Sequence, residues 1–366
     1  MRLNKSNVSA ICLPIFKIVA IFLILFSIFS YIVSLLLGPI LFYGTSDGLT
    51  TAAREIRDIP LSIFMVIPIQ IPLRTNMGTL FGGLWLVFIL CIIAACYSRK
   101  GFVKSVKNLL TAPILSAKTN FLILMPLVAT SLLSASLLIQ KFQETQGVQT
   151  GSLTFPPQTS QYVILINLAL APINEELAFR ITSIGLPLGL FLLYHYRNGS
   201  RVSGIGNWIK FLIAVMLSPE HAKVAHGYKN VTELGLVRGI SILEWILILV
   251  TSVAFGLAHF LLGGGWEAGK VSTALLAGLV FGVMFVAYGA YAAILLHWFF
   301  DYYFTVVSLA ESTYGGIFHA FSTMVDVTNI VGGQIVLIVL LLLWAVKCAD
   351  YLSKRAVGLT EHSDTI

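Results

Sequence analysis

Long apolar runs separated by short polar segments recur along the whole chain. Most of these runs reach the ~20 residues that a helix needs to cross the ~30 Å hydrocarbon core of a bilayer. Backbone polar groups cannot stay unpaired in lipid, so repeated crossings require helices or a closed barrel. Because the runs are continuous rather than alternating, they predict helices. The expected membrane-spanning helices, about eight, are 14–42, 78–97, 121–140, 161–182, 241–262, 271–287, 290–308 and 330–348.

The composition supports an all-α polytopic membrane protein. Hydrophobic residues make up 57% of the chain and charged residues only 11%, whereas soluble domains have about 25% charged residues. The net charge of +7 does not indicate nucleic acid binding, because no basic patch with interleaved aromatic residues is present. The four cysteines lie in or beside the apolar runs without CxxC or Cys/His spacing, so no disulfide framework is expected.

The distribution of basic residues predicts the topology. Segment 98–108 carries four basic residues and no acid, which places it in the cytoplasm. Segment 308–329 has two acids and no Lys or Arg, so we expect an external loop there, and a second one at 143–161. An even number of crossings returns both termini to the cytoplasm, in agreement with their basic residues. The prediction is a multi-pass protein of the cell membrane.

Two segments do not fit the pattern of spans. Segment 58–74 contains three prolines, and we expect an external interfacial element there. Segment 183–217 is interpreted as a cytoplasmic extension of the fourth helix. Within the apparent insertion 197–240, His221 and Lys223 are expected in a solvated loop. The expected domains are N-terminal spans with external loops at 1–160, a catalytic core at 161–310, and a final span with a cytoplasmic tail at 311–366.

Charged residues inside the apolar runs are the first candidates for function, since each costs several kcal/mol unless it is paired or faces a cavity. In EELAFR, Glu176 and Arg180 are four residues apart and share a helix face, where an ion pair can form. Glu175 is turned ~100° away and stays available for chemistry. The alternative is a helix end at the membrane interface, whose charges reach the headgroups.

Two further motifs place histidines inside apolar runs. In FGLAH, Phe255 and His259 share a helix face, although a histidine bonded to a backbone carbonyl is the simpler interpretation. In HWFFD, His297 and Asp301 also share a face, and a carboxylate one turn away can fix the tautomer of an imidazole. Together with Glu175, two imidazoles in a cavity of low dielectric constant can activate water.

These motifs predict a division of roles. Glu175 would act as general base, His259 would position the water or carry its proton, and His297 with Asp301 would meet or orient the developing oxyanion. At 1.5 Å per residue, however, the depth of His259 in the membrane differs by roughly 10–15 Å from the depth of Glu175 and His297. Tilt or kinking of a helix must close this offset.

In this order, the three motifs resemble those of the CAAX protease and bacteriocin-processing family of intramembrane proteases (CPBP or ABI, Rce1-like). The resemblance rests on EELAFR at 175–180, FGLAH at 255–259 and HWFFD at 297–301, and it covers roughly 160–310. It implies a core of membrane helices and an endopeptidase activity. The best-understood members of the family remove the final residues of prenylated C-terminal CAAX sequences.

Carried over by position, the resemblance implies that Glu175 and His259 activate water and that His297 and Asp301 form an oxyanion hole. Asp301 departs from the family, which has Asn there, and an ionised Asp cannot donate a hydrogen bond. Asp301 is therefore protonated, or it orients His297, or it binds a metal. The supporting positions in the motifs are Glu176, Arg180 and Phe255.

Metal dependence stays open at this stage. Glu175, His259 and His297 could ligate Zn²⁺, which would make the protein a zinc-dependent intramembrane metalloprotease. No HExxH motif is present, and that spacing is the one that places two ligands and a base on one helix. We therefore expect a glutamic-type mechanism without a cofactor, with zinc as the alternative.

Two other classes of protein remain as alternatives. A proton-coupled secondary transporter would use Glu175, His259 and Asp301 as a proton relay, but transporters usually show paired repeats, which this chain lacks. A proteolytically silent membrane scaffold would retain the same motifs. The expected partners are the lipid bilayer and a membrane-associated protein or peptide substrate, with or without a lipid modification, and no nucleic acid.

Overall fold

The computed structural model describes residues 5–109, 118–197, 204–262 and 264–363. It is 79% helical, which confirms the predicted all-α polytopic membrane fold. Within these residues, eight helical segments are long and apolar enough to cross a bilayer. They are Lys17–Gly44, Met77–Tyr97, Phe121–Thr145, Gln161–His195, Ile242–Leu261, Ala268–Tyr288, Ala290–Tyr314 and Ile317–Val346.

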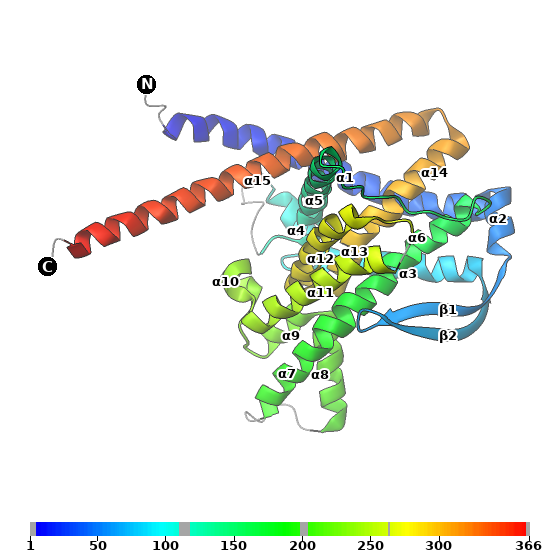
Figure 1. The fold of residues 1–366 in the computed structure, drawn as a ribbon, viewed down its shortest axis with the longest axis horizontal. Helices are drawn as coiled ribbons and strands as arrows, with labels where there is room; N and C mark the ends of the chain where they lie inside the picture. The colour runs from blue at the N-terminus through cyan, green and yellow to red at the C-terminus, as the bar shows by residue number, and fades with distance from the viewer. Residues whose placement is uncertain (1–4, 110–117, 198–203, 263, 364–366) are drawn as a thin grey trace.

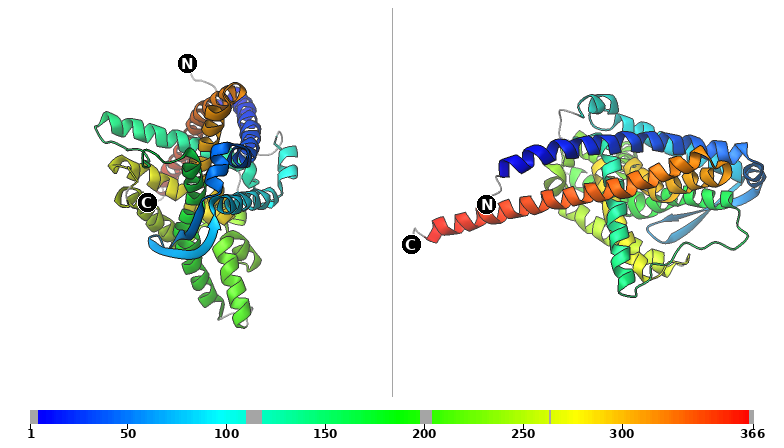
Figure 2. Two further views of the ribbon diagram at one scale, coloured as in Figure 1. Left: turned by 90° about the vertical axis from the view of Figure 1, so that its right-hand side faces the viewer. Right: turned by 90° about the horizontal axis from the view of Figure 1, so that it is seen from above.

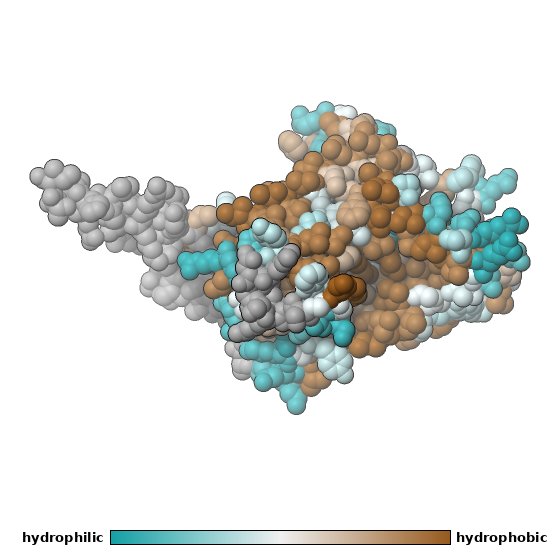
Figure 3. Space-filling view, turned by 90° about the horizontal axis from the view of Figure 1, so that it is seen from below, coloured by the Kyte–Doolittle hydropathy of each residue, from teal (hydrophilic) through white to brown (hydrophobic). Residues whose placement is uncertain are grey.

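The two longest helices, α1 (Lys5–Gly44) and α15 (Ile317–Ser363), run side by side along one edge of the molecule. The start of α1 and the end of α15 lie at the same end (Figure 1). Helix α5 (Phe121–Thr145) crosses both of them (Figure 2). The spans therefore do not share one axis. Hydrophobic side chains form a broad region on the face shown in Figure 3, with hydrophilic side chains gathered toward its margins.

Helix α13 (Ala290–Trp298) lies at the centre of the fold and is buried along nearly its whole length. It follows α12 (Ala268–Tyr288) across a sharp turn at Gly289, whose φ of 112° lies in a region that favours glycine. A Cβ atom at this position would lie 2.7 Å from the carbonyl oxygen of Leu217, so only glycine fits there. The turn fixes the start of the helix that carries the third motif.

Segment 58–74 belongs to a β-hairpin, an element that was not predicted from the sequence. Strands β1 (Glu55–Ile63) and β2 (Ile67–Asn76) pair antiparallel, with Ile59 opposite Ile71. The sequence of β2 alternates apolar residues with Pro or Gln, the period of a strand, and prolines are tolerated in a two-stranded sheet because both strands are edges. Two of the three residues at the tip, Phe64 and Met65, have positive φ.

The predicted extension of the fourth helix is present. Helix α6 (Gln161–Glu176) continues through a π-helical segment, η1 (Leu177–Gly185), into α7 (Leu186–Arg197), and α8 (Ile205–Leu217) packs back against α7. The two segments approach each other closely at Gly185, which faces the backbone of Met216. The side of the membrane on which this hairpin lies stays a prediction. The other short helices are α2 (Ser46–Ala52), α4 (Phe102–Lys107), α9 (Pro219–Ala225) and α10 (Val231–Gly239).

Two predictions about polar segments are wrong. Lys223 is not in a solvated loop: it is 2% exposed, and its ammonium lies 2.7 Å from Oε1 of Glu244, a partner that the charge pattern could not reveal. Residues 308–329 do not form a loop, since α14 (Phe304–Tyr314) and α15 are interrupted only at Gly315 and Gly316. A deficit of basic residues indicates which side a segment occupies, and it says nothing about backbone conformation.

Candidate active site

The backbone departs from regular α-helix at two of the three motifs. The first motif begins at the end of α6 and continues into η1. The third begins in α13 and continues into a second π-helical segment, η2 (Phe299–Tyr303). A π-helical turn carries an extra residue and changes the directions of the side chains around it, and such turns are frequent at functional sites. This local geometry brings the two motifs together.

Glu176 and Arg180 form the ion pair that their spacing predicts. Both side chains are fully buried, with 3.0 Å between Nη1 and Oε1, which excludes the alternative of a helix end exposed at the interface. Arg180 also donates from Nη2 to the carbonyl oxygen of Gly278 at 3.2 Å, and its guanidinium lies 4.4 Å from the ring centre of Phe255. Hydrogen bonds and an aromatic face offset the loss of water around this cation.

His297 is held between three carboxyl groups. Its Nδ1 donates to Oε1 of Glu176 at 2.9 Å. Its Nε2 lies 3.2 Å from Oδ2 of Asp301 and 3.7 Å from Oε2 of Glu175. Glu176 therefore bridges Arg180 and His297, a contact that helical spacing alone did not predict. Since Nδ1 donates, a proton must lie on Nε2 or on a facing carboxyl group to avoid repulsion between lone pairs.

His259 has a defined tautomer. Its Nδ1 lies 2.8 Å from the carbonyl oxygen of Phe255, and a carbonyl only accepts, so Nδ1 carries the proton and Nε2 of the neutral ring keeps its lone pair. His259 therefore makes the hydrogen bond to a backbone carbonyl that the simpler, structural interpretation expects. Its Nε2 nevertheless remains available for chemistry. The ring of Phe255 contacts His259 at 4.7 Å and His297 at 5.8 Å between centroids, so it lies beside both imidazoles.

One cavity joins the second and third motifs. It has a volume of about 290 Å³, and its lining includes His259, His297 and Asp301. Both histidines line this one cavity, so the offset expected along straight helices does not separate them. Glu175 is not among the lining residues and reaches this group through its contact with His297. Its Oε2 is buried and accepts no hydrogen bond from the described residues.

The structure adds residues that sequence reasoning missed. Lys270 and Gln140 also line the cavity, and the ammonium of Lys270 lies 3.9 Å from the ring centre of Trp266. Lys270 is the charged residue directly before the apolar run 271–310, a position that resembles an ordinary helix start. Only the packing of α12 against α5 and α11 (Ile242–Leu261) reveals that this lysine faces the cavity.

The tip of the β-hairpin docks on η1. The backbone N–H of Met65 donates to the carbonyl oxygen of Ala178 at 3.1 Å, and that of Phe64 donates to Oγ1 of Thr182 at 2.9 Å. Met65 also packs against a small apolar cluster that contains Phe179 and Phe255. The hairpin therefore supports the backbone of the first motif from outside the bundle.

The suggested zinc ligands do not form a metal site. In the part of the chain that the structure describes, no group of three or more His, Cys, Asp or Glu side chains could hold a metal ion. Glu175, His259 and His297 all lie in this part. The described residues therefore do not fit a zinc site, and the absence of a cofactor stays a prediction.

Comparison with known proteins places the motifs in one family. Residues 157–303 match the family described as type II CAAX prenyl endopeptidase Rce1-like. This segment is therefore similar to the Rce1-like family. It contains all three motifs, so the resemblance indicated by the sequence is confirmed there. Comparison with curated proteins and with solved structures gives no match. The family supports a CAAX-type intramembrane endopeptidase, and it leaves the catalytic residues to be tested.

Proposed function

We propose that the protein is an intramembrane endopeptidase in which Glu175 and His259 activate a water molecule. The water oxygen attacks the carbonyl carbon of the scissile peptide bond, and the proton it loses passes to a carboxylate or imidazole and then to the leaving amine. His297, with its proton on Nε2, donates to the developing oxyanion. The C–N bond then breaks, and the products are a new carboxylate and a new amine.

The observation that carries this proposal is the position of His297. It contacts Glu175, Glu176 and Asp301 and lines one cavity with His259, and all of these residues lie within the Rce1-like segment. Oriented acids, bases and hydrogen-bond donors around a cavity are the parts that peptide hydrolysis needs. Glu176 and Arg180 act as positioning residues, since their side chains are fully buried behind His297.

Asp301 supports this mechanism as an orienting group. Its carboxylate oxygen lies 3.2 Å from Nε2 of His297, so it can hold a protonated imidazole in place until substrate arrives. An orienting role explains how Asp301 can stand where related proteases have Asn, because this role does not require Asp301 itself to donate a hydrogen bond.

We propose a short extended segment of a membrane-associated protein as substrate. The cavity of about 290 Å³ is at the lower end of the ~300–1,000 Å³ range of ligand pockets, so a few residues fit and a folded domain does not. The Rce1-like match favours a segment near the C-terminus that carries a prenylated cysteine.

A cleavage assay tests the proposal. Purified full-length protein in liposomes is incubated with membrane-anchored peptides, with and without a prenylated cysteine near the C-terminus, and the products are identified by mass spectrometry. Glu175→Gln is expected to slow cleavage by ~10²–10⁴-fold, whereas Glu233→Gln, the same change at an exposed position on α10, is expected to leave it unchanged. Cleavage unaffected by Glu175→Gln, or proton-coupled uptake without cleavage, would overturn the proposal.

The same assay addresses metal dependence. We propose that cleavage needs no metal, and a chelator is expected to leave the rate unchanged. If the chelator abolishes activity, and if Zn²⁺ restores it while a change of ionic strength does not, the zinc-dependent alternative would be favoured.

A further inference from the structure

Lys270 is a cation on the wall of the cavity that contains the candidate active site, and the proposed mechanism does not use it. Its ammonium lies 3.9 Å from the ring centre of Trp266. Its charge also interacts with Asp301 and Glu175, but both of these carboxylates are in contact with His297. Among the described residues of the lining, Asp301 is the single acid. The direct contact of Lys270 is therefore an aromatic face, which leaves its ammonium able to bind an anionic group of a ligand.

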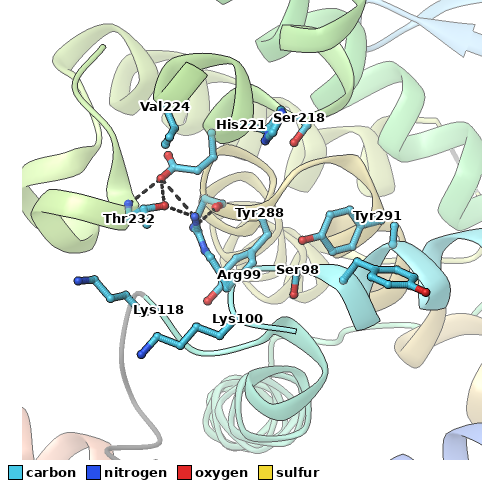
Figure 4. Close-up of a pocket in the computed structure, with 14 residues that line it drawn as sticks. Ser98, Arg99, Lys100, Lys118, Ser218, His221, Val224, Thr232, Tyr288 and Tyr291 are labelled. Carbon is cyan, nitrogen blue, oxygen red and sulfur yellow. Dashed lines mark hydrogen bonds and ion pairs between the residues drawn. The ribbon is translucent and has the colours of Figure 1, made fainter. Parts of the chain in front are cut away.

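A cation in a second cavity is already paired. This cavity has a volume of about 650 Å³ and shares no lining residue with the first (Figure 4). Its walls include the end of α3 (Met77–Tyr97), α9 and the end of α12. There Arg99 lies 3.5 Å from Oε1 of Glu220 and donates to the carbonyl oxygen of Ala287. These contacts fix the loop after α3, so Lys270 is the stronger candidate for binding a ligand.

Two paired segments close the cavity at the end where Lys270 lies. Segment 149–154 follows α5, and segment 264–269 leads into α12. Four backbone hydrogen bonds of 2.8–3.2 Å join these segments, and Thr150 and Trp266, one from each, line the cavity. A peptide that continued past Lys270 would have to separate this pairing, whereas a peptide that ends there would leave it intact.

Thr150 adds a second polar group without a partner at this end. Its side chain is 6% exposed, and its hydroxyl makes no hydrogen bond with the described residues. A buried hydroxyl that is left unpaired costs free energy, and a hydroxyl can donate to a carboxylate in a charge-assisted hydrogen bond. The ammonium of Lys270 and the hydroxyl of Thr150 therefore match one carboxylate, whose two oxygens both accept hydrogen bonds.

We propose that Lys270 and Thr150 bind the free C-terminal carboxylate of the peptide substrate, so that cleavage occurs a few residues from the chain end. This inference rests on the proposed peptidase function and names the group that the substrate must present. The cavity of about 290 Å³ holds only a few residues, and His259 and His297 line it as well. A carboxylate at the closed end would therefore direct one of the last peptide bonds toward the two imidazoles.

An acidic side chain of the substrate offers the same chemistry as the chain end. Its own backbone, however, would have to continue beyond Lys270 and through the paired segments 149–154 and 264–269. The closed wall therefore favours the C-terminal carboxylate as the occupant.

Matched peptides test this assignment. Full-length protein in liposomes is given two membrane-anchored peptides of one sequence, one with a free C-terminal carboxylate and one with a C-terminal amide, and initial rates give kcat and KM for each. The amide is expected to raise KM by ~10–100-fold with little change of kcat, because the lost contact is remote from the reacting atoms.

Variants assign the effect to the two side chains. Lys270→Met keeps the length of the side chain and is expected to raise KM ~10–100-fold for the carboxylate peptide alone. Lys270→Arg keeps the charge and is expected to restore most of the preference for the carboxylate. Thr150→Val removes one neutral hydrogen bond and is expected to raise KM for the same peptide about fivefold.

Controls separate this site from general charge attraction and from a structural role. Lys141→Met changes an exposed lysine of α5 outside the lining and is expected to leave both values of KM unchanged. A third peptide, amidated and ending in glutamic acid, shows whether a side chain can supply the carboxylate, and it is expected to be cleaved as poorly as the other amide.

The outcomes distinguish this inference from the peptidase proposal. Equal KM for the carboxylate and amide peptides, equal losses on both peptides in Lys270→Met, or efficient cleavage of the glutamic acid amide would each overturn the assignment and leave the peptidase function in place. If the unchanged protein cleaves none of the peptides, the proposed function fails, and this inference fails with it.

Discussion

Asp301 is the residue at which the chain departs from related proteases, and its contact with His297 predicts how it can be replaced. Asp301→Asn keeps the shape of the side chain and can still bond to Nε2 through its amide, so we expect a loss of cleavage rate below about tenfold. Asp301→Ala removes the orienting partner, and such losses are typically ~10–100-fold. Rates of peptide cleavage measure both variants. Equal rates for Asp301→Ala and the unchanged protein would contradict an orienting role.

Arg180 shows what a buried charge contributes to stability. Its side chain is fully buried against Glu176, so Arg180→Met removes the cation beside this buried carboxylate and leaves His297 as its remaining partner. We expect the free energy of unfolding to fall by ~3–5 kcal/mol, measured by denaturation in detergent. Arg238→Met replaces an exposed arginine on α10 and is expected to change it by less than ~0.5 kcal/mol. Similar stability of both variants would show that the pair is not a structural requirement.

At the scale of elements, the hairpin tip is predicted to depend on Thr182. Thr182→Val keeps the volume but cannot accept the hydrogen bond from the backbone of Phe64. The lost bond is worth about 1 kcal/mol, so hydrogen exchange at the hairpin tip should accelerate about fivefold.

The matched control for this prediction is Thr251→Val. The hydroxyl of Thr251 donates only within α11, so its removal should leave the hairpin unchanged. An equal acceleration in both variants would mean that Thr182 does not hold the hairpin to η1.

The elements also show where sequence patterns are informative. Continuous apolar runs predicted all eight candidate spans, because lipid demands length and hydrophobicity that few other structures share. The hairpin is not among the expected elements, because the three prolines of segment 58–74 indicate only that it does not form a simple span. The π-helical segments at Leu177 and Phe299 have no signal of their own in this single sequence.

The candidate site was predicted in part for the same physical reason. Charged groups inside apolar runs are costly, so Glu175, His297 and Asp301 could be found from the sequence. Their distances could not, because these depend on how helices cross. The bridge from Glu176 to His297 and the place of Lys270 in the cavity arise only from that packing.

For the whole molecule, the charge pattern predicts that Lys229 and the loop at 146–160 lie on opposite sides of the membrane. Single cysteines at Lys229→Cys and Gln158→Cys, in a chain whose native cysteines are replaced, should react with a membrane-impermeant maleimide from opposite sides of sealed vesicles. Both positions are exposed. Labelling of both from the same side would contradict the predicted topology.

The most direct test of the central claim, that Glu175 and His259 act on one water molecule, is a double-mutant cycle on the cleavage rate. Each of Glu175→Gln and His259→Asn is expected to slow single-turnover cleavage by ~10²–10⁴-fold. Groups that act as a unit are strongly non-additive, so the account predicts a double variant about as slow as the slower single variant. A double variant whose loss equals the product of the two single losses would contradict it.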